Sequence, residues 1–102
     1  MQELTEQTFR PSLKNGSSIV EFYTDWCTVC KQMAPTLDNL SKAYPNVRFA
    51  KLNAGSNPIV ASMFTVMSVP TFLFVKDGRI VDQVSGFMTQ GQFKEKIEKK
   101  LR

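Results

Sequence analysis

The chain has no histidine and only two cysteines among its 102 residues. A closed zinc site normally takes four cysteine or histidine ligands, so we expect no metal site. Cys27 and Cys30 are separated by only two residues, and a disulfide closing so short a loop restrains the unfolded chain little. The pair therefore points to redox chemistry rather than to a structural cross-link.

Long apolar runs are also missing. The run Phe72-Leu73-Phe74-Val75 is far shorter than the ~18 residues that indicate a membrane span. The N-terminal residues, Met1-Gln2-Glu3-Leu4, lack the basic and apolar regions of a signal peptide. We therefore expect a cytoplasmic protein with no membrane partner.

Positive charge is only slightly in excess, and the net charge is +4. Much of the excess lies near the C-terminus, where we expect a solvated helix face. A nucleic-acid interface would need basic residues interleaved with exposed aromatics or a known module, and neither is present. The residues in question are Lys94, Lys96, Lys99, Lys100 and Arg102.

The length and composition fit one soluble globular domain covering residues 1–102, since 42% of residues are hydrophobic and 22% are charged. Apolar spacing and turn residues predict the order β-α-β-α-β-α-β-β-α. The expected strands lie near Leu4 and at 18–24, 47–52, 72–76 and 80–85. The expected helices follow Thr8 and end at Asn15-Gly16, cover 31–43, begin at Ser56-Asn57-Pro58, and follow a capping box at Thr89-Gln92.

The predicted core comes from the apolar faces of these elements. For the helix after Pro58 we expect a buried face of Ile59, Val60, Met63 and Phe64. Three methionines are interpreted as core filler: Met33, Met63 and Met67. Five aromatic residues are also assigned to the core: Tyr23, Phe49, Phe64, Phe72 and Phe74.

The stretch from Trp26 to Lys31 lies between a predicted strand and a predicted helix and contains the only tryptophan. Its first cysteine, Cys27, would stand at the helix N-terminus, where unpaired N–H groups and the helix dipole favour a thiolate. The thiolate is the reactive species in disulfide exchange. The sequence therefore predicts a dithiol–disulfide switch at this turn.

This pattern resembles the thioredoxin family over nearly the whole chain. The resemblance depends on residue types in the right order and at the right spacing: Phe22, Trp26, Cys27, Cys30, Lys31, Pro35, Lys51-Leu52-Asn53, Val69-Pro70-Thr71, Phe74, Asp77-Gly78 and Gly86. It implies an α/β thioredoxin fold with a central mixed five-stranded sheet flanked by four helices. It also implies a cis peptide bond between Val69 and Pro70.

The resemblance further implies a protein-disulfide reductase with no cofactor beyond the Cys27–Cys30 couple. Cys27 would be the nucleophile and the more exposed sulfur, and Cys30 would resolve the mixed disulfide. Glu21, expected to be buried, would accept the Cys30 proton and form a buried, coupled pair with Lys51. The substrate surface would comprise Trp26, Thr28, Val29, Val69, Pro70, Gly86 and Phe87, with Ala54 completing an apolar groove.

The chain departs from the family pattern in three respects. Thr28-Val29 replaces the usual Gly-Pro, Glu21 replaces aspartate, and Phe87 replaces a small residue. The Thr-Val pair restores an N–H near the Cys27 sulfur, so we expect a less reducing couple; alternatively, the two β-branched residues simply fit the turn.

Partners implied by the resemblance are a flavin-dependent thioredoxin reductase and disulfide-containing proteins, with the chain itself a monomer. One alternative is a dedicated redox partner of a single enzyme, and another is a disulfide oxidase or isomerase in an oxidising compartment. A third is a non-catalytic binding module that retains the groove.

Overall fold

The structure is a computed structural model that describes residues 1–102. Its elements follow the predicted order β-α-β-α-β-α-β-β-α. They are β1 (Gln2–Leu4), α1 (Phe9–Leu13), β2 (Ser17–Tyr23), α2 (Thr28–Ala43), β3 (Val47–Asn53), α3 (Pro58–Met63), β4 (Thr71–Lys76), β5 (Arg79–Ser85) and α4 (Gln90–Lys100). The largest boundary difference is at α2, which begins three residues earlier than the apolar spacing indicates.

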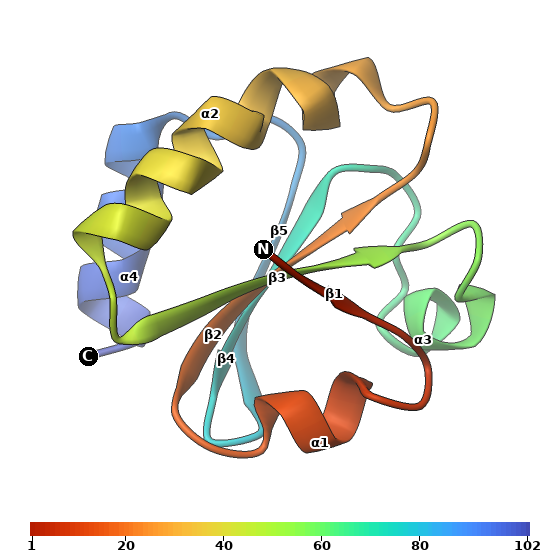
Figure 1. The fold of residues 1–102 in the computed structure, drawn as a ribbon, viewed down its shortest axis with the longest axis horizontal. Helices are drawn as coiled ribbons and strands as arrows, with labels where there is room; N and C mark the ends of the chain where they lie inside the picture. Colours follow the sequence, from red (N-terminus) through yellow and green to blue (C-terminus); the bar gives the residue numbers. More distant parts are fainter.

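The five strands form one mixed sheet in the order β1-β3-β2-β4-β5 (Figure 1). β1, β3 and β2 run parallel, whereas β4 is antiparallel to β2 and β5 is antiparallel to β4. The central strand β2 is buried on both faces, which explains its nearly continuous apolar sequence. The mixed five-stranded sheet flanked by four helices is confirmed.

Helices cover both faces of the sheet, α2 and α4 on one side and α1 and α3 on the other (Figure 1). Along β2, Val20 and Phe22 pack under α1 and α3, whereas Ile19 packs under α2 and α4. Because strand side chains alternate between faces, Glu21 lies on the same face as Ile19. This alternation directs an acidic side chain beneath the helix that carries the second cysteine.

Local turn and cap signals are confirmed. Asp77 and Gly78, between β4 and β5, both have positive φ (50° and 82°), as a two-residue hairpin of the type that favours Asp-Gly requires. At the start of α4, Thr89 and Gln92 exchange the two hydrogen bonds of a capping box.

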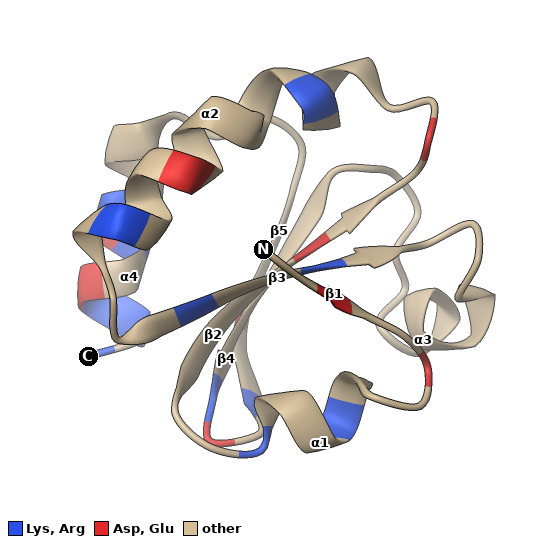
Figure 2. Cartoon of the chain, viewed as in Figure 1, with Lys and Arg blue, Asp and Glu red and all other residues tan.

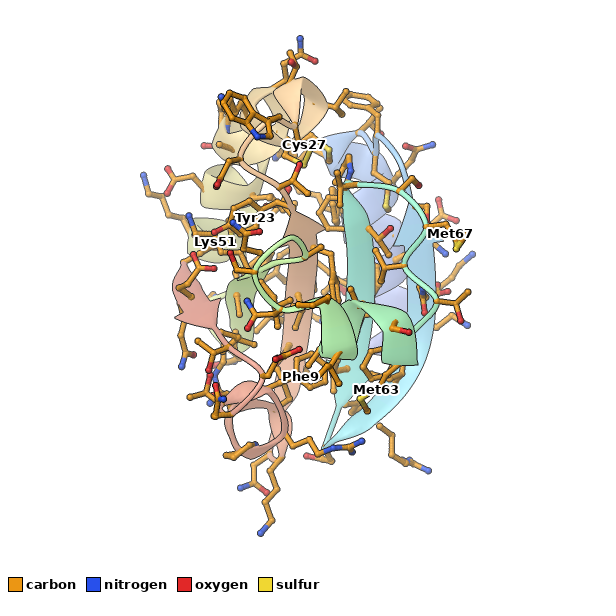
Figure 3. All side chains as sticks on the ribbon, turned by 90° about the vertical axis from the view of Figure 1, so that its right-hand side faces the viewer. Phe9, Tyr23, Cys27, Lys51, Met63 and Met67 are labelled. Carbon is orange, nitrogen blue, oxygen red and sulfur yellow. A yellow bond between two sulfur atoms is a disulfide. The ribbon has the colours of Figure 1, made fainter.

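Part of the predicted core is wrong. Met33 is fully buried, but Met63 is 49% exposed and Met67 is 87% exposed; Figure 3 labels both side chains. Ile59 is also exposed, because the six-residue α3 buries only the narrow face that carries Val60 and Ala61. Met67 belongs to the loop after α3, where no element covers it.

The predicted aromatic core is confirmed for Phe49, Phe72 and Phe74, which are buried. Phe64 is half-buried and lies 5.4 Å from Phe9, centroid to centroid. Tyr23 is only half-buried, so its placement in the core was wrong. Its hydroxyl donates to the Glu3 carboxylate.

The basic residues of α4 form a largely solvated helix face, as expected (Figure 2). Lys99 pairs with Glu95 one turn away at 3.0 Å, and Lys96 reaches Asp82 on β5 at 2.6 Å. No helix is both long enough and apolar enough to span a bilayer.

Candidate active site

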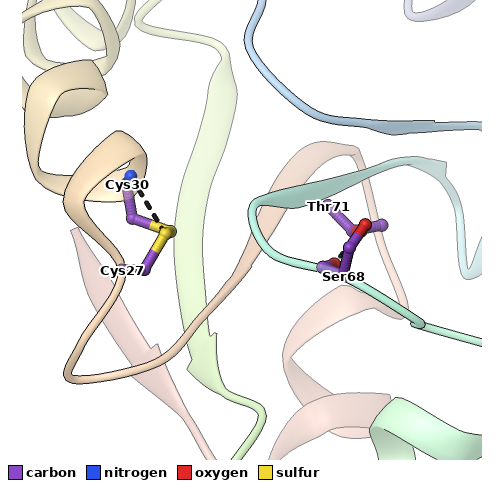
Figure 4. Close-up of a disulfide and its surroundings, with 4 residues drawn as sticks. All are labelled: Cys27, Cys30, Ser68 and Thr71. Atoms are coloured by element: carbon purple, nitrogen blue, oxygen red, sulfur yellow. Dashed lines mark hydrogen bonds between the residues drawn. A yellow bond between two sulfur atoms is a disulfide. The ribbon is translucent and has the colours of Figure 1, made fainter.

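Cys27 and Cys30 form a disulfide at the N-terminus of α2, with their Cα atoms 5.3 Å apart. Cys27 has extended backbone angles and is the N-cap residue, while Cys30 is already inside the first turn. The Cys30 N–H donates a hydrogen bond to Cys27 Sγ at 3.1 Å (Figure 4). The same N–H and the helix dipole would stabilise negative charge on Cys27 once the disulfide is reduced.

The two cysteines are buried to the same degree, with Cys27 7% and Cys30 8% exposed. The prediction that Cys27 is the more exposed is therefore wrong for this disulfide form. The adjacent Trp26 is 90% exposed and does not pack in the core. Thr28 and Val29 are also exposed, so an apolar surface adjoins the disulfide.

The loop before β4 lies in the surroundings of the disulfide (Figure 4). The Val69–Pro70 peptide bond is cis, as the resemblance implied. Thr71 Oγ1 donates to the Ser68 carbonyl at 2.7 Å, and the Gly86 N–H donates to the Pro70 carbonyl at 2.8 Å. Ser68 was not predicted to belong to the site, and its carbonyl helps hold the proline loop.

Beyond Gly86, the side chain of Phe87 is 63% exposed. Gly86 itself has a φ of +94°, a backbone conformation that glycine adopts without the penalty of a Cβ. The predicted groove residues Val69 and Ala54 are half-buried.

Glu21 is only 5% exposed, and its Oε2 atom has no hydrogen-bond partner. Burial raises the pKa of Glu21 from the ordinary 4.5 to about 7, while the positive charge of Lys51 acts in the opposite direction. The expectation of a buried acid on β2 is confirmed, and this acid can exist in both protonation states near neutral pH.

Lys51 does not form the buried pair with Glu21 that the resemblance implied. The two residues are opposite each other in the β2–β3 register, but the Lys51 side chain is 39% exposed and its ammonium lies 3.8 Å from Glu3 Oε1. Only the three-residue β1 lies outside β3, so the lysine reaches the rim of the sheet. Glu3 was not among the predicted site residues.

The Thioredoxin family model matches residues 1–99. The chain belongs to the thioredoxin family. It is 38% identical to the thioredoxin of Staphylococcus saprophyticus over 100 residues, covering 97% of this chain and 96% of the relative. The Staphylococcus aureus thioredoxin is 35% identical over the same length. The oxidised form of mitochondrial thioredoxin 3 from Saccharomyces cerevisiae superposes with a TM-score of 0.89 and 34% identity, covering 97% of this chain and 94% of that one.

Family membership and the paired cysteines make this thioredoxin-family protein a thiol–disulfide oxidoreductase. Its site includes a pocket of about 250 Å³ beneath the start of α2, to which Glu21 and Cys30 both contribute. The buried acidic residue and the second cysteine therefore line one common pocket. No group of three or more cysteine and carboxylate side chains is placed to hold a metal ion.

Proposed function

We propose that this protein reduces disulfides in other proteins, with Cys27 as the attacking sulfur and Cys30 as the resolving sulfur. The supporting observation is the position of the two cysteines on α2. Cys27 caps the helix and accepts the Cys30 N–H, so a thiolate is favoured there. Cys30 lies one turn further on, where it can attack a sulfur bonded to Cys27.

The proposed reaction has two exchange steps. The Cys27 thiolate attacks one sulfur of the partner disulfide, a mixed disulfide forms, and the other partner sulfur leaves as a thiolate that takes a proton from water. Cys30 then loses its proton and attacks Cys27 Sγ, which re-forms the Cys27–Cys30 disulfide and expels the second partner thiolate. Two electrons pass from the protein to the partner.

Glu21 is the proposed acceptor of the Cys30 proton. Glu21 and Cys30 line the same pocket, and in the proposed step the proton passes between them directly or through one water. A pKa of about 7 leaves a substantial carboxylate fraction at neutral pH and still allows the proton to be returned. The positive charge of Lys51 contributes by lowering the pKa of Glu21.

Replacing Glu21 with glutamine should slow the second exchange step and leave the first nearly unchanged. The expected loss in the rate of mixed-disulfide resolution at pH 7 is about 10²-fold, the lower end of general-base effects. Rapid-quench separation of the mixed disulfide from the products measures both steps. An equal effect on both steps would contradict a proton-transfer role.

The proposed substrate surface surrounds the disulfide. Exposed Trp26 and Phe87 offer apolar contacts, and the backbone of Val69 beside Pro70 offers hydrogen bonds to an extended peptide, in the manner of strand addition. Gly86, Thr28, Val29 and Ala54 would complete this surface. It fits partner segments that are extended and apolar next to their disulfide.

The proposed electron donor is a flavin-dependent thioredoxin reductase. A reducing compartment such as the cytoplasm fits this role, because the dithiol must be regenerated after each turnover. We propose that the protein acts as a monomeric electron carrier with no cofactor beyond its own disulfide.

The potential of the Cys27–Cys30 couple tests the direction of the reaction. We expect a value between about −270 mV, typical of thioredoxins, and about −200 mV. Substituting Thr28→Gly together with Val29→Pro removes the Val29 N–H but keeps the Cys30 N–H that donates to Cys27 Sγ, and should make the potential more negative by about 30 mV. Equilibration with glutathione buffers measures the potential of the wild type and of the double variant.

A wild-type potential of about −120 mV would instead identify a strong oxidant. An unchanged or less negative potential in the double variant would show that Thr28 and Val29 fit the turn without making the couple less reducing.

A further inference from the structure

Charged residues form a row across three neighbouring strands. Glu3 of β1 lies opposite Lys51 of β3, and Lys51 lies opposite Glu21 of β2. Figure 2 shows acidic and basic segments close together on these strands. Beyond Glu21 the row continues with the apolar residues Phe72 of β4 and Val84 of β5. Lys51 therefore lies between two carboxyl groups, the outer one of Glu3 and the inner one of Glu21.

The outer carboxyl is held in place. The Tyr23 hydroxyl donates to both oxygens of Glu3, at 2.8 Å each. The Lys51 ammonium lies 3.8 Å from Glu3 Oε1 and 5.3 Å from the centroid of the Tyr23 ring. Figure 3 shows Tyr23 and Lys51 side by side below Cys27. No ion pair joins Lys51 to Glu21, whose Oε2 has no partner.

We propose that Glu3 is a positioning residue: together with Tyr23 it holds the Lys51 ammonium at the outer end of the row, away from the Glu21 carboxyl. The consequence for the reaction rests on the proposed role of Glu21 as acceptor of the Cys30 proton. Because Lys51, the cation whose charge lowers the pKa of Glu21, is held elsewhere, Glu21 stays easy to protonate near neutral pH.

Two effects of Glu3 act in the same direction. Its negative charge repels a carboxylate at Glu21, and its attraction for Lys51 weakens the stabilisation that the lysine would give that carboxylate. Without Glu3, the flexible four-carbon stem of Lys51 would be free to turn inward. The other ionisable residues lining the pocket beside Glu21 are Tyr23, Asp25, Cys30, Lys31 and the N-terminal residue Met1. β4 contributes only the uncharged Phe72 to this row.

The test is a carbon-13 NMR titration of the Glu21 carboxyl in the oxidised full-length protein. Glu3→Gln keeps an oxygen acceptor for Tyr23 but removes the charge, so the pKa of Glu21 should fall by about one unit, from about 7 to about 6. Glu95→Gln is the matched control, because it also breaks an ion pair with a lysine, Lys99 on α4. It should leave the pKa of Glu21 unchanged. An unchanged or raised pKa in Glu3→Gln would overturn the proposal.

Lys51→Met separates positioning from simple repulsion. If Glu3 acts mainly by holding the lysine, the effect of Glu3→Gln on the Glu21 pKa should fall to less than half in a Lys51→Met background. A full effect in that background would show that Glu3 acts only as a nearby negative charge, and would overturn the positioning role.

The pH profile of mixed-disulfide resolution separates this inference from the proposed function. In Glu3→Gln the profile should move to lower pH together with the Glu21 titration. If the titration moves and the profile does not, Glu3 still controls the pKa of Glu21, but Glu21 is not the proton acceptor. If neither moves, the positioning role itself is wrong.

Discussion

Replacing Cys30 with serine should convert the protein into a covalent trap for its substrates. Cys27 can still attack a partner disulfide, but no second sulfur is held one helical turn away to resolve the adduct. Intramolecular attack has an effective concentration far above that of any external thiol, so release in millimolar thiol should be at least about 10³-fold slower. Non-reducing electrophoresis and mass measurement of the protein mixed with insulin would detect the adduct.

Cys27→Ser is the control for this trap. It should form no adduct, because the sulfur at the helix N-cap is missing. Trapping by Cys27→Ser but not by Cys30→Ser would mean that the two sulfurs have the opposite roles. Insulin turnover by Cys30→Ser at the wild-type rate would contradict the two-sulfur mechanism altogether.

Glu21 should make the oxidised protein less stable as the pH rises. Its folded pKa of about 7 exceeds its ordinary value of 4.5, so between these values the folded state retains a proton that the unfolded state has lost. Stability is therefore full below pH 4.5 and falls as the pH rises to about 7, by about 3 kcal/mol in total. Glu21→Gln cannot ionise and should not show this loss.

Urea unfolding at pH 5 and pH 8 measures the effect. The fall in the free energy of unfolding between these pH values should be larger in the wild type than in Glu21→Gln by about 2 kcal/mol, because part of the loss has already occurred at pH 5. Glu95→Gln, on the exposed face of α4, should behave like the wild type. Equal falls in the wild type and Glu21→Gln would show that Glu21 titrates at its ordinary pKa in the folded state.

Most of the fold could be predicted from local signals. The hairpin at Asp77-Gly78 and the capping box at Thr89 are set by neighbouring residues. A nearly continuous apolar sequence identified the central strand β2, and alternating apolar residues identified β3. The cis bond before Pro70 came from the family resemblance, because local sequence does not distinguish it from the commoner trans form. The buried position of Glu21 was expected from the apolar strand around it, and the resemblance strengthened that expectation.

The errors concern contacts between segments far apart in the chain. Lys51 was expected to pair with Glu21, but β1 brings Glu3 to the other side of the lysine. Met63 and Met67 are apolar, yet their exposure depends on how little surface the short α3 and the following loop can cover. Apolar character predicts burial only where another element is available to cover the side chain.

The central claim is that Cys27 and Cys30 together deliver two electrons to a protein disulfide, and a single-turnover experiment tests it most directly. Fully reduced protein is mixed with excess insulin without any other reductant, and thiols are counted in each protein after separation. The account predicts that each molecule of this protein opens one insulin disulfide, and that its Cys27 and Cys30 are converted to the intramolecular disulfide. Reduced cysteines persisting beside intact insulin would contradict it.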